Sequence, residues 1–337
     1  MKAMVLDAPN DVTLQNIEKP AIEGDTLVRV SHSGICGTDL SIYKGGIPVQ
    51  YPRVMGHEMV GEIVDTGDGE VNPKGTRIIA DPVYYCGRCY QCRDGQQQLC
   101  TNGGLIGRDR NGGFAEYLSI PSVNVFPLPD EVSNAEAPLI QVLTTCLHAH
   151  RLTQIFPGDA VVVIGLGVTG QLHIQLAKAR GAYPIIGITR SQWKRELAET
   201  LGADITFAPD ENTKKKVLDA TNGVGADLVI ESAGAVPAFA QAIDLVRSGG
   251  RVMPFGTYTA KEGEFSFYDL YFKEIEIINA RAAKGQDFPT CIDLVKRGVI
   301  NLAPLITHNL SLGDLGDALK MLKSGEGKQM KIVLDHS

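Results

Sequence analysis

Six short apolar runs, separated by helix-like segments, occupy the middle of this 337-residue chain. They are AVVVI at 160–164, IIGI at 185–188, DITF at 204–207, DLVIE at 227–231, RVMPF at 251–255 and EIEIIN at 274–279. Runs that are apolar nearly throughout and alternate with helices are typical of a parallel sheet covered on both faces. Six strands also match a complete doubly wound dinucleotide-binding sheet. The sequence therefore predicts an α/β domain of this kind.

The segment after the first run carries a G-x-G-x-x-G pattern that leads into a helix. In such a loop the first glycine permits a tight turn and the second lets the backbone approach a pyrophosphate. The third allows the helix to pack closely on the strand, so that the helix N-terminus faces the phosphates. The predicted phosphate-binding residues are Gly165, Leu166, Gly167, Val168, Thr169 and Gly170.

The end of the second run bears on which dinucleotide binds. An NAD site usually places an acidic residue about 20 residues after the glycines, but no Asp or Glu lies between Gly170 and Arg195. An arginine with neighbouring hydroxyls suits a 2′-phosphate, because the guanidinium can bind it bidentately. NADP is therefore predicted over NAD, bound by Thr189, Arg190, Ser191 and Lys194; the alternative is a solvated basic helix start.

Four of the seven cysteines fall within residues 86–100, with the spacing C-x2-C-x2-C-x7-C. Four thiolates complete a tetrahedral zinc shell and leave no position open for substrate. An iron–sulfur cluster is the alternative, although the spacing departs from the bacterial ferredoxin run. The prediction is a structural zinc held by Cys86, Cys89, Cys92 and Cys100.

Composition and charge exclude several classes of protein. The net charge of −7 argues against a nucleic-acid binder, and no apolar run approaches the ~18–20 residues of a membrane span. No apolar signal region follows Met1. The sequence thus predicts a soluble, cytoplasmic protein with reduced thiols. Its first ~140 residues, rich in glycine and short β-like runs, predict an antiparallel β-rich domain without a long helix before about residue 134.

Two further segments, Cys36-Gly-Thr38-Asp39 and Gly56-His57-Glu58, precede the cysteine cluster and the glycine-rich loop. Together, in this order, these motifs resemble the zinc-dependent medium-chain dehydrogenase/reductase family over essentially the whole chain. The resemblance implies a GroES-like catalytic domain made from residues 1–144 and 284–337, with a structural zinc lobe at about 86–100. A Rossmann domain is expected at residues 145–283.

The resemblance also implies roles for individual residues in the first domain. Cys36 and His57 would be ligands of a catalytic zinc, and Thr38 would take the proton of the substrate hydroxyl. Asp39 would orient His57. Glu58 would be a group behind the ligands or an alternative ligand.

Two positions depart from the family pattern. Gln141 stands where the family usually has Cys, Glu or Asp as third zinc ligand, an arrangement similar to archaeal-type glucose dehydrogenases. The alternative is that Gln141 is a polar residue at a helix start and that zinc is absent. Ser41 replaces a histidine that relays the proton in many relatives, so the outer relay is left open between Ser41, the cofactor ribose and water.

In the second domain the nicotinamide is expected near the ends of strands four to six, at Ala233, Gly234, Gly256, Thr257 and Arg281. His148 and His150 are expected to be structural or surface residues, and Cys146 and Cys291 buried apolar ones.

The predicted activity is hydride transfer between NADP and an alcohol or carbonyl of a sugar, polyol or small secondary alcohol, with two zinc ions per subunit. The alternatives are a zinc-independent quinone or enone reductase of the same fold and a non-enzymatic nucleotide-binding protein. The family resemblance further implies a homodimer or homotetramer, formed through the edge strand EIEIINA.

Overall fold

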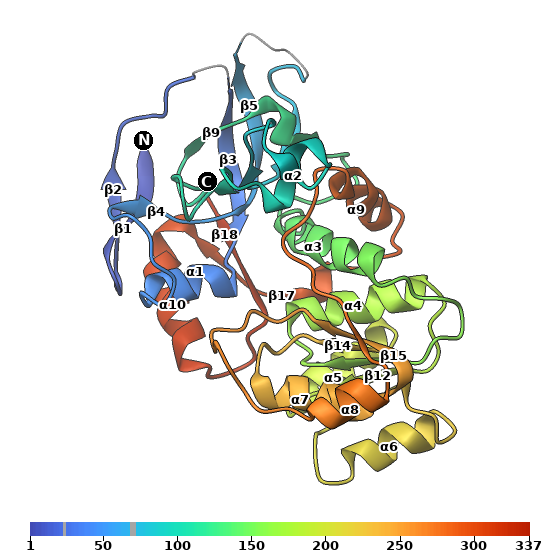
Figure 1. Cartoon of the computed structure of the whole chain (residues 1–337). Helices are drawn as coiled ribbons and strands as arrows, with labels where there is room; N and C mark the ends of the chain where they lie inside the picture. Colours follow the sequence, from blue (N-terminus) through green and yellow to red (C-terminus); the bar gives the residue numbers. More distant parts are fainter. Residues whose placement is uncertain (23–24, 68–71) are drawn as a thin grey trace. The chain divides into compact units, whose positions relative to one another are not determined.

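The computed structural model describes residues 1–22, 25–67 and 72–337, which form two compact units (Figure 1). Unit 1 comprises Met1–Thr144, Ala282–Gly298 and Leu302–Ser337, and unit 2 comprises Thr145–Arg281 and Val299–Asn301. Both ends of the chain therefore lie in unit 1. The chain re-enters unit 1 at Ala282, slightly before the position at residue 284 that the sequence suggested.

The main sheet of unit 1 has the strand order β10-β6-β5-β3-β18-β17, and β9 also pairs with β3. Its strands are β3 (Thr26–Gly34), β5 (Glu58–Thr66), β6 (Arg77–Ala80), β9 (Tyr117–Ile120), β10 (Val125–Pro127), β17 (Ile306–Ser311) and β18 (Lys331–Asp335). Strand β18 pairs antiparallel with β3 and parallel with β17. A strand from the far end of the chain thus lies inside a sheet that the first part of the chain builds.

The remaining elements of unit 1 surround this sheet. A second sheet has the order β2-β1-β4, and β7 pairs with β8. These strands are β1 (Lys2–Ala8), β2 (Asp11–Asn16), β4 (Arg53–Val54), β7 (Val83–Tyr84) and β8 (Gly104–Leu105). The helices are α1 (Gly37–Tyr43), α2 (Tyr90–Arg93), α9 (Asp287–Lys296) and α10 (Leu315–Ser324), with the 3-10 turns η1 (Gln97–Leu99), η2 (Ser122–Asn124), η3 (Ala303–Leu305) and η4 (Leu312–Asp314). Helix α3 (Pro138–Leu152) begins in unit 1 and continues into unit 2, because the boundary falls between Thr144 and Thr145.

Unit 2 contains a parallel sheet in the order β13-β12-β11-β14-β15-β16. Its strands are β11 (Val161–Ile164), β12 (Ile185–Ile188), β13 (Ile205–Phe207), β14 (Ala226–Glu231), β15 (Val246–Pro254) and β16 (Glu276–Ile277). Numbered within the unit, this order is 3-2-1-4-5-6, that of the doubly wound dinucleotide-binding fold. The fold predicted from the apolar runs is confirmed, although β16 is much shorter than the run EIEIIN.

The helices of unit 2 are α4 (Val168–Ala179), α5 (Gln192–Leu201), α6 (Thr213–Ala220), α7 (Val236–Leu245) and α8 (Phe267–Phe272). Alternate residues of β11 enter different cores, because successive side chains of a strand point to opposite faces. Val161 and Val163 pack with Ile174 of α4, whereas Val162 and Ile164 belong to the cluster that contains Leu245 of α7. Both faces of the sheet are buried at β11 and β12, which explains why these two strands are apolar throughout.

No helix in the described ranges combines the length and the apolar character that crossing a membrane would require.

Candidate functional site

A thiol, an imidazole and a carboxylate meet in unit 1. One ligand atom each from Cys36, His57 and Glu58 lies within 4.8 Å of the others. Cys36 follows β3 and caps the N-terminus of α1, while His57 immediately precedes β5. Strands β3 and β5 pair antiparallel, with Gly34 opposite Glu58. The sheet register therefore brings two segments that are separate in the sequence to one point.

Asp39 connects these two segments. Its Oδ2 accepts the backbone N–H of Cys36 at 2.9 Å, and its Oδ1 accepts the backbone N–H of Gly56 at 3.3 Å. The same Oδ1 lies 3.3 Å from Nδ1 of His57, an ion-pair distance; Nδ1 makes no hydrogen bond of good geometry to the described residues. Asp39 thus faces one nitrogen of His57 and leaves Nε2 for another partner, the arrangement found behind metal-bound histidines.

Glu58 is held from the opposite end of the chain. Nζ of Lys331, the first residue of β18, lies 2.8 Å and 2.7 Å from the two carboxylate oxygens and also donates to the carbonyl of Ile35. Gly34 leaves the room for this carboxylate, because a Cβ at Gly34 would stand 2.0 Å from Oε2 of Glu58. Burial alone would lower the pKa of Lys331, but the charge of Glu58 raises it, so the amine keeps its proton.

The donor set suits zinc. Thiolate, imidazole and carboxylate are its usual protein ligands, and three of them leave one position open. Burial alone would lower the pKa of His57, yet the charges of Asp39 and Cys36 raise it well above its usual range. The pocket is therefore negative around His57, and a divalent cation would be stabilised there.

The other residues predicted for this site are placed as follows. Thr38 lies in the first turn of α1 and is partly exposed. The Ser41 hydroxyl donates to the carbonyl of Gly37 at 3.0 Å, so its proton is already engaged within the helix. Gln141 is buried in the first turns of α3. The sequence had not predicted helix α1, which positions Cys36, Thr38 and Asp39.

The four cysteines of residues 86–100 converge on one point. Their sulfur atoms all lie within 4.8 Å of one another, with 3.6 Å between Cys100 and Cys86 and 3.8 Å between Cys89 and Cys100. A tetrahedron with Zn–S bonds of ~2.3 Å has sulfur–sulfur edges of about 3.8 Å. These distances fit a tetrahedral metal and are far longer than the ~2.05 Å of a disulfide.

The electrostatics of this lobe also favour thiolates. The backbone N–H groups of Cys92 and then Thr101 lower the pKa of Cys89 to about 6. Those of Arg88 and Cys89 lower the pKa of Cys86. Desolvation acts the other way on Cys92 and raises its pKa to about 12. A metal ion would remove that last proton, since coordinating thiols are deprotonated.

The glycine-rich loop of unit 2 has the geometry that a phosphate-binding turn requires. Gly165 adopts a φ of +89°, and a Cβ there would stand 2.8 Å from the nitrogen of Ala233. A Cβ at Gly170 would stand 2.0 Å from the carbonyl oxygen of Gly165. At Gly167, the N-cap of α4, an added Cβ would meet no atom of the described residues within 4 Å. Close packing therefore requires glycine at Gly165 and Gly170, whereas the space beside Gly167 is open and forms a cradle for a ligand.

The segment after β12 contains the predicted 2′-phosphate residues. Arg195 donates to the carbonyls of Thr189 and Arg190 at 2.8 Å and 2.9 Å and so fixes this turn. Ser191 caps α5, and the Arg190 side chain is exposed. Gln171 of α4 donates to the carbonyl of Lys194 at 2.8 Å. This hydrogen bond therefore connects helix α4, which follows the glycine-rich loop, to the basic segment after β12 within unit 2.

The residues predicted near the nicotinamide also lie together. The Glu231 carboxylate accepts the N–H groups of Ala233 at 2.7 Å and Gly234 at 3.0 Å, and it also accepts the Tyr258 hydroxyl. A Cβ at Gly256 would stand 2.1 Å from the nitrogen of Gly234. Thr257 lies beside Gly234, whereas Arg281 is an exposed residue at the end of the unit.

Several further residues lie outside the candidate metal and nucleotide sites. His148 and His150 are buried, so the surface alternative was wrong for both. Nε2 of His150 lies 3.0 Å from Nδ1 of His173, and the two rings stack. Cys146 and Cys291 are fully buried, as predicted. Sequence reasoning missed Lys331, although a lysine opening the apolar strand KIVLD was a signal of a buried charge.

Comparisons with known proteins agree with this geometry. The family model described as alcohol dehydrogenase GroES-like domain matches residues 22–130, and the model described as zinc-binding dehydrogenase matches residues 168–297. Among curated proteins, sorbitol dehydrogenase of Halalkalibacterium halodurans is 34% identical over 91% of this chain and 90% of its own length. L-threonine 3-dehydrogenase of Pyrococcus abyssi is 33% identical over 95% and 93% of the two chains.

Solved structures give the same result. A protein from Sinorhizobium meliloti 1021, described as a zinc-binding dehydrogenase and bound to NADP, has a TM-score of 0.93 and 32% identity. The match covers 99% of each chain. The likeness therefore extends across both units.

Proposed function

This chain belongs to the zinc-type medium-chain dehydrogenase family, and we propose that it transfers hydride between NADP and an alcohol or carbonyl. The substrate is a sugar, a polyol or a small secondary alcohol. The observation that carries the proposal is the buried convergence of Cys36, His57 and Glu58 in unit 1, with Thr38 in the adjoining turn of α1.

Cys36 and His57 would hold a catalytic zinc, with Glu58 or Gln141 completing the shell. When bound, zinc supplies Lewis-acid polarisation of the substrate oxygen, and the dinucleotide supplies the hydride acceptor. Asp39 keeps His57 in the orientation that presents Nε2 to the metal. Thr38 would accept the proton of the substrate hydroxyl at Oγ1 and pass its own hydroxyl proton on to Ser41, the cofactor ribose or water. Cys86, Cys89, Cys92 and Cys100 would hold a second, structural zinc.

In unit 2, the cradle at Gly167 and the N-terminus of α4 would receive the pyrophosphate. The exposed guanidinium of Arg190 and the hydroxyls of Thr189 and Ser191 would bind a 2′-phosphate. Two features support NADP over NAD: this basic turn and the lack of an acidic residue between Gly170 and Arg195.

Metal analysis and activity test the catalytic site together. Wild type should oxidise at least one alcohol from a panel of sugars, polyols and secondary alcohols with NADP, and chelation should abolish the reaction. Cys36→Ala should lose both the catalytic zinc and activity, and Gln141→Ala should show whether the amide is a ligand. A Cys36→Ala protein that kept its metal and its activity would disprove the site.

Cofactor choice has its own test. Arg190→Ala should weaken NADPH binding by roughly 10- to 100-fold, the loss of a charge-assisted contact, and leave NADH binding nearly unchanged. Lys215→Ala is a matched control, because it removes one positive charge from an exposed ion pair elsewhere in unit 2. Equal NADPH affinity in Arg190→Ala and wild type would refute the NADP assignment.

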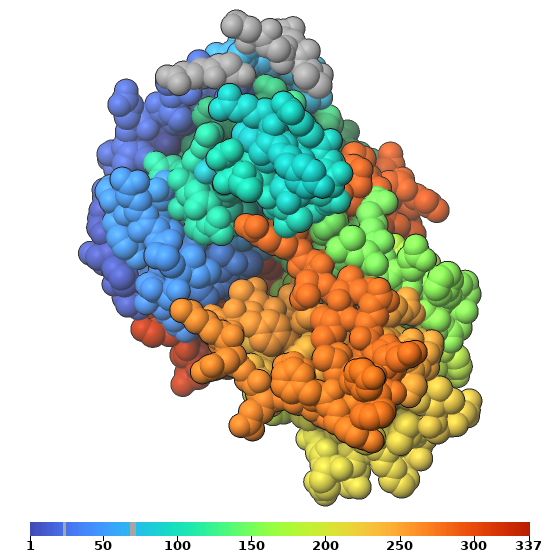
Figure 2. Space-filling view, in the orientation of Figure 1, coloured from blue at the N-terminus to red at the C-terminus, as the bar shows by residue number. Residues whose placement is uncertain are grey.

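We also propose a homodimer or homotetramer that uses the edge of the unit 2 sheet. Strand β16 ends the sheet order, and α8 beside it exposes four aromatic side chains, Phe267, Tyr268, Tyr271 and Phe272. Figure 2 shows the orange segment that contains α8 at the molecular surface. Tyr271→Glu should shift the mass in light scattering toward the monomer, whereas Phe156→Glu, an exposed aromatic elsewhere, should not.

A further inference from the structure

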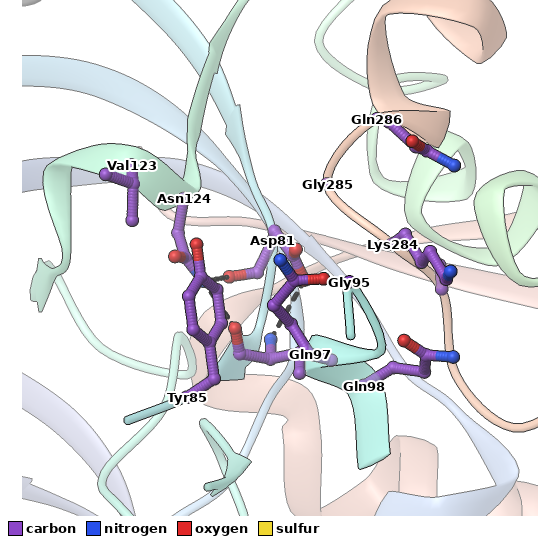
Figure 3. A pocket seen from close by; sticks show the side chains of 12 residues that line it. Asp81, Tyr85, Gly95, Gln97, Gln98, Val123, Asn124, Lys284, Gly285 and Gln286 are labelled. Carbon is purple, nitrogen blue, oxygen red and sulfur yellow. Dashed lines mark hydrogen bonds between the residues drawn. The ribbon is translucent and has the colours of Figure 1, made fainter. Parts of the chain in front are cut away.

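A polar cavity of about 240 Å³ lies within unit 1, outside the Cys36–His57 cluster. Asp81, Tyr85, Gln97, Gln98, Lys284 and Gln286 supply its polar lining. Figure 3 shows Asp81 near the centre of this lining, with Tyr85 and Asn124 on one side and Gln98 and Lys284 on the other. The volume is slightly below the ~300–1,000 Å³ of pockets for larger ligands, so the cavity suits a small polar fragment.

The strand register places Asp81 at the same end of the sheet as the candidate zinc ligands. Strands β5 and β6 pair antiparallel, with Val60 opposite Ile79 and Gly61 opposite Ile78. Continuing this register puts Asp81, the residue after β6, opposite Glu58, the first residue of β5. His57, which precedes β5, and Asp81, which follows β6, thus lie at the same end of two paired strands.

Asp81 is held rigidly in the cavity wall. Its Oδ1 accepts the N–H of Val83 at 2.9 Å, and Asn124 donates to the Asp81 carbonyl at 2.9 Å. Gly285 lies on the other side of the carboxyl, where a Cβ would stand 3.8 Å from Oδ2, an ordinary contact distance. Burial raises the pKa of the Asp81 carboxyl to about 7, with Asp287 adding to the shift. Near neutral pH this group can both donate to and accept from a hydroxyl.

The four-cysteine lobe supplies another part of the wall. Gln97 and Gln98 begin the turn η1, between Cys92 and Cys100. Gln98 is 7% exposed; its Nε2 donates to Oε1 of Gln96, but its Oε1 has no hydrogen-bond partner among the residues that the structure describes. Buried amide oxygens are normally satisfied. Because Gln97 and Gln98 lie between Cys92 and Cys100, a metal that orders the lobe would also shape this cavity.

The lining mixes hydrogen-bond donors and acceptors: one carboxyl, one ammonium, amides and a phenol. A phosphate would meet the Asp81 carboxyl unfavourably, whereas hydroxyl groups could use every one of these side chains. We propose that this cavity binds the hydroxyl groups of a neutral polyol or sugar beyond its reacting carbon, an inference that rests on the proposed dehydrogenase function. Asp81 and Gln98 are then the residues that determine specificity.

The test compares two classes of substrate in the zinc-loaded enzyme with NADP. One class is neutral polyols (xylitol, sorbitol and galactitol), and the other is short secondary alcohols such as 2-butanol. Wild type should prefer a polyol. Asp81→Asn, which keeps an acceptor for the Val83 N–H, should raise the KM for that polyol about 10-fold or more. Its kcat, and both constants for 2-butanol, should stay near the wild-type values.

Gln98→Ala is the second variant and should act in the same direction if Asp81→Asn folds poorly. Arg93→Ala, an exposed change in the same lobe, is the control and should behave as wild type. Thermal melting of each variant verifies folding independently of turnover, and polyol-induced thermal stabilisation should shrink in Asp81→Asn.

Three outcomes overturn the inference. Wild type could prefer 2-butanol to every polyol, or Asp81→Asn could change both substrate classes alike. The third is a preference for a polyol phosphate with tighter binding in Asp81→Asn and weaker binding in Lys284→Met, which would identify an anion subsite. If wild type oxidised no alcohol of either class with NADP or NAD, the dehydrogenase function itself would fail, and this distinguishes the two hypotheses.

Discussion

Lys331 and Glu58 stand 273 residues apart in the sequence and form a buried ion pair, with Nζ 2.7 Å from Oε2. Both side chains are almost completely shielded from water. Glu58 in turn lies beside Cys36 and His57. A charge from the last strand of the printed chain therefore balances the carboxylate that is nearest to the candidate zinc ligands.

Removing the lysine should cost stability. Lys331→Met leaves the Glu58 carboxylate buried without a counterion, a change that typically lowers the free energy of unfolding by about 3–5 kcal/mol. Urea denaturation measures the loss. Lys331→Arg should lose less, and Lys320→Met, which breaks an exposed pair with Asp317, should change stability little because water screens that pair. A Lys331→Met protein as stable as the Lys320→Met control would show that Glu58 does not depend on this partner.

Two glycines of the phosphate loop should fail in different ways. Gly170→Ala places a methyl group against the Gly165 backbone, so overpacking should lower stability by about 1–3 kcal/mol. Gly167→Ala meets no atom within 4 Å, so its melting temperature should stay near that of wild type while NADPH binding falls. Thermal melts and fluorescence titration separate the two effects. Unchanged NADPH affinity in Gly167→Ala would mean that the pyrophosphate does not approach this residue.

The two metal sites should respond differently to loss of a ligand. Wild type should contain about two zinc ions per chain and each single-ligand variant about one, because each site holds its own ion. The four-cysteine site is closed, whereas the catalytic site keeps one position open for substrate. Cys89→Ser should lower the melting temperature and expose the lobe of residues 86–100 to proteases. Cys36→Ser should abolish activity with little change in melting. Elemental analysis with limited proteolysis decides, and a Cys89→Ser protein that kept its metal would disprove the four-thiolate site.

The buried histidine pair should make unit 2 sensitive to acid. Burial first, and then the charges of His173 and Arg180, lower the pKa of His150 well below its usual range. Burial alone lowers that of His173 to about 3. The unfolded chain takes up protons below pH ~6.5 while the folded pair does not. Stability should therefore fall as the pH drops from about 6.5 toward 3, and His173 should account for about 2 kcal/mol of the loss at pH 5.

The measurement uses Trp193, the only tryptophan of the chain, which lies in unit 2. Its fluorescence should follow unfolding of wild type and of the His150→Leu/His173→Leu variant at pH 7 and pH 5. The variant should lose less stability between these two values. Equal losses in both proteins would place the acid sensitivity elsewhere, for example at His336, whose pKa burial lowers to about 4.

The part of this structure that the sequence predicted best rests on local patterns. The strand order of unit 2 followed from apolar runs and glycine spacing, and the family resemblance and the GroES-like and Rossmann folds are confirmed. Short-range spacing also located the four-cysteine cluster, whose sulfur atoms do converge.

What the sequence did not reveal depends on long-range pairing. Nothing near Lys331 in the chain indicates that its partner is Glu58, because their contact follows from β18 entering the sheet beside β3. Helix α1 is too short to show a periodic pattern, and the pairing of His150 with His173 joins two different helices. The cavity around Asp81 is likewise assembled from four separate segments.

The position of β18 also orders events during synthesis. Residues 145–281 of unit 2 leave the ribosome before the strand that completes unit 1 exists. Until residues 331–335 emerge, residues 32–34 of β3 lack their neighbour on one side and Glu58 lacks its counterion. The nucleotide-binding sheet can therefore close early, whereas the metal-bearing half keeps part of a strand edge open until residues 331–335 have been made. An open edge invites pairing with other chains, so we expect slow or truncated synthesis to yield aggregates seeded by unit 1.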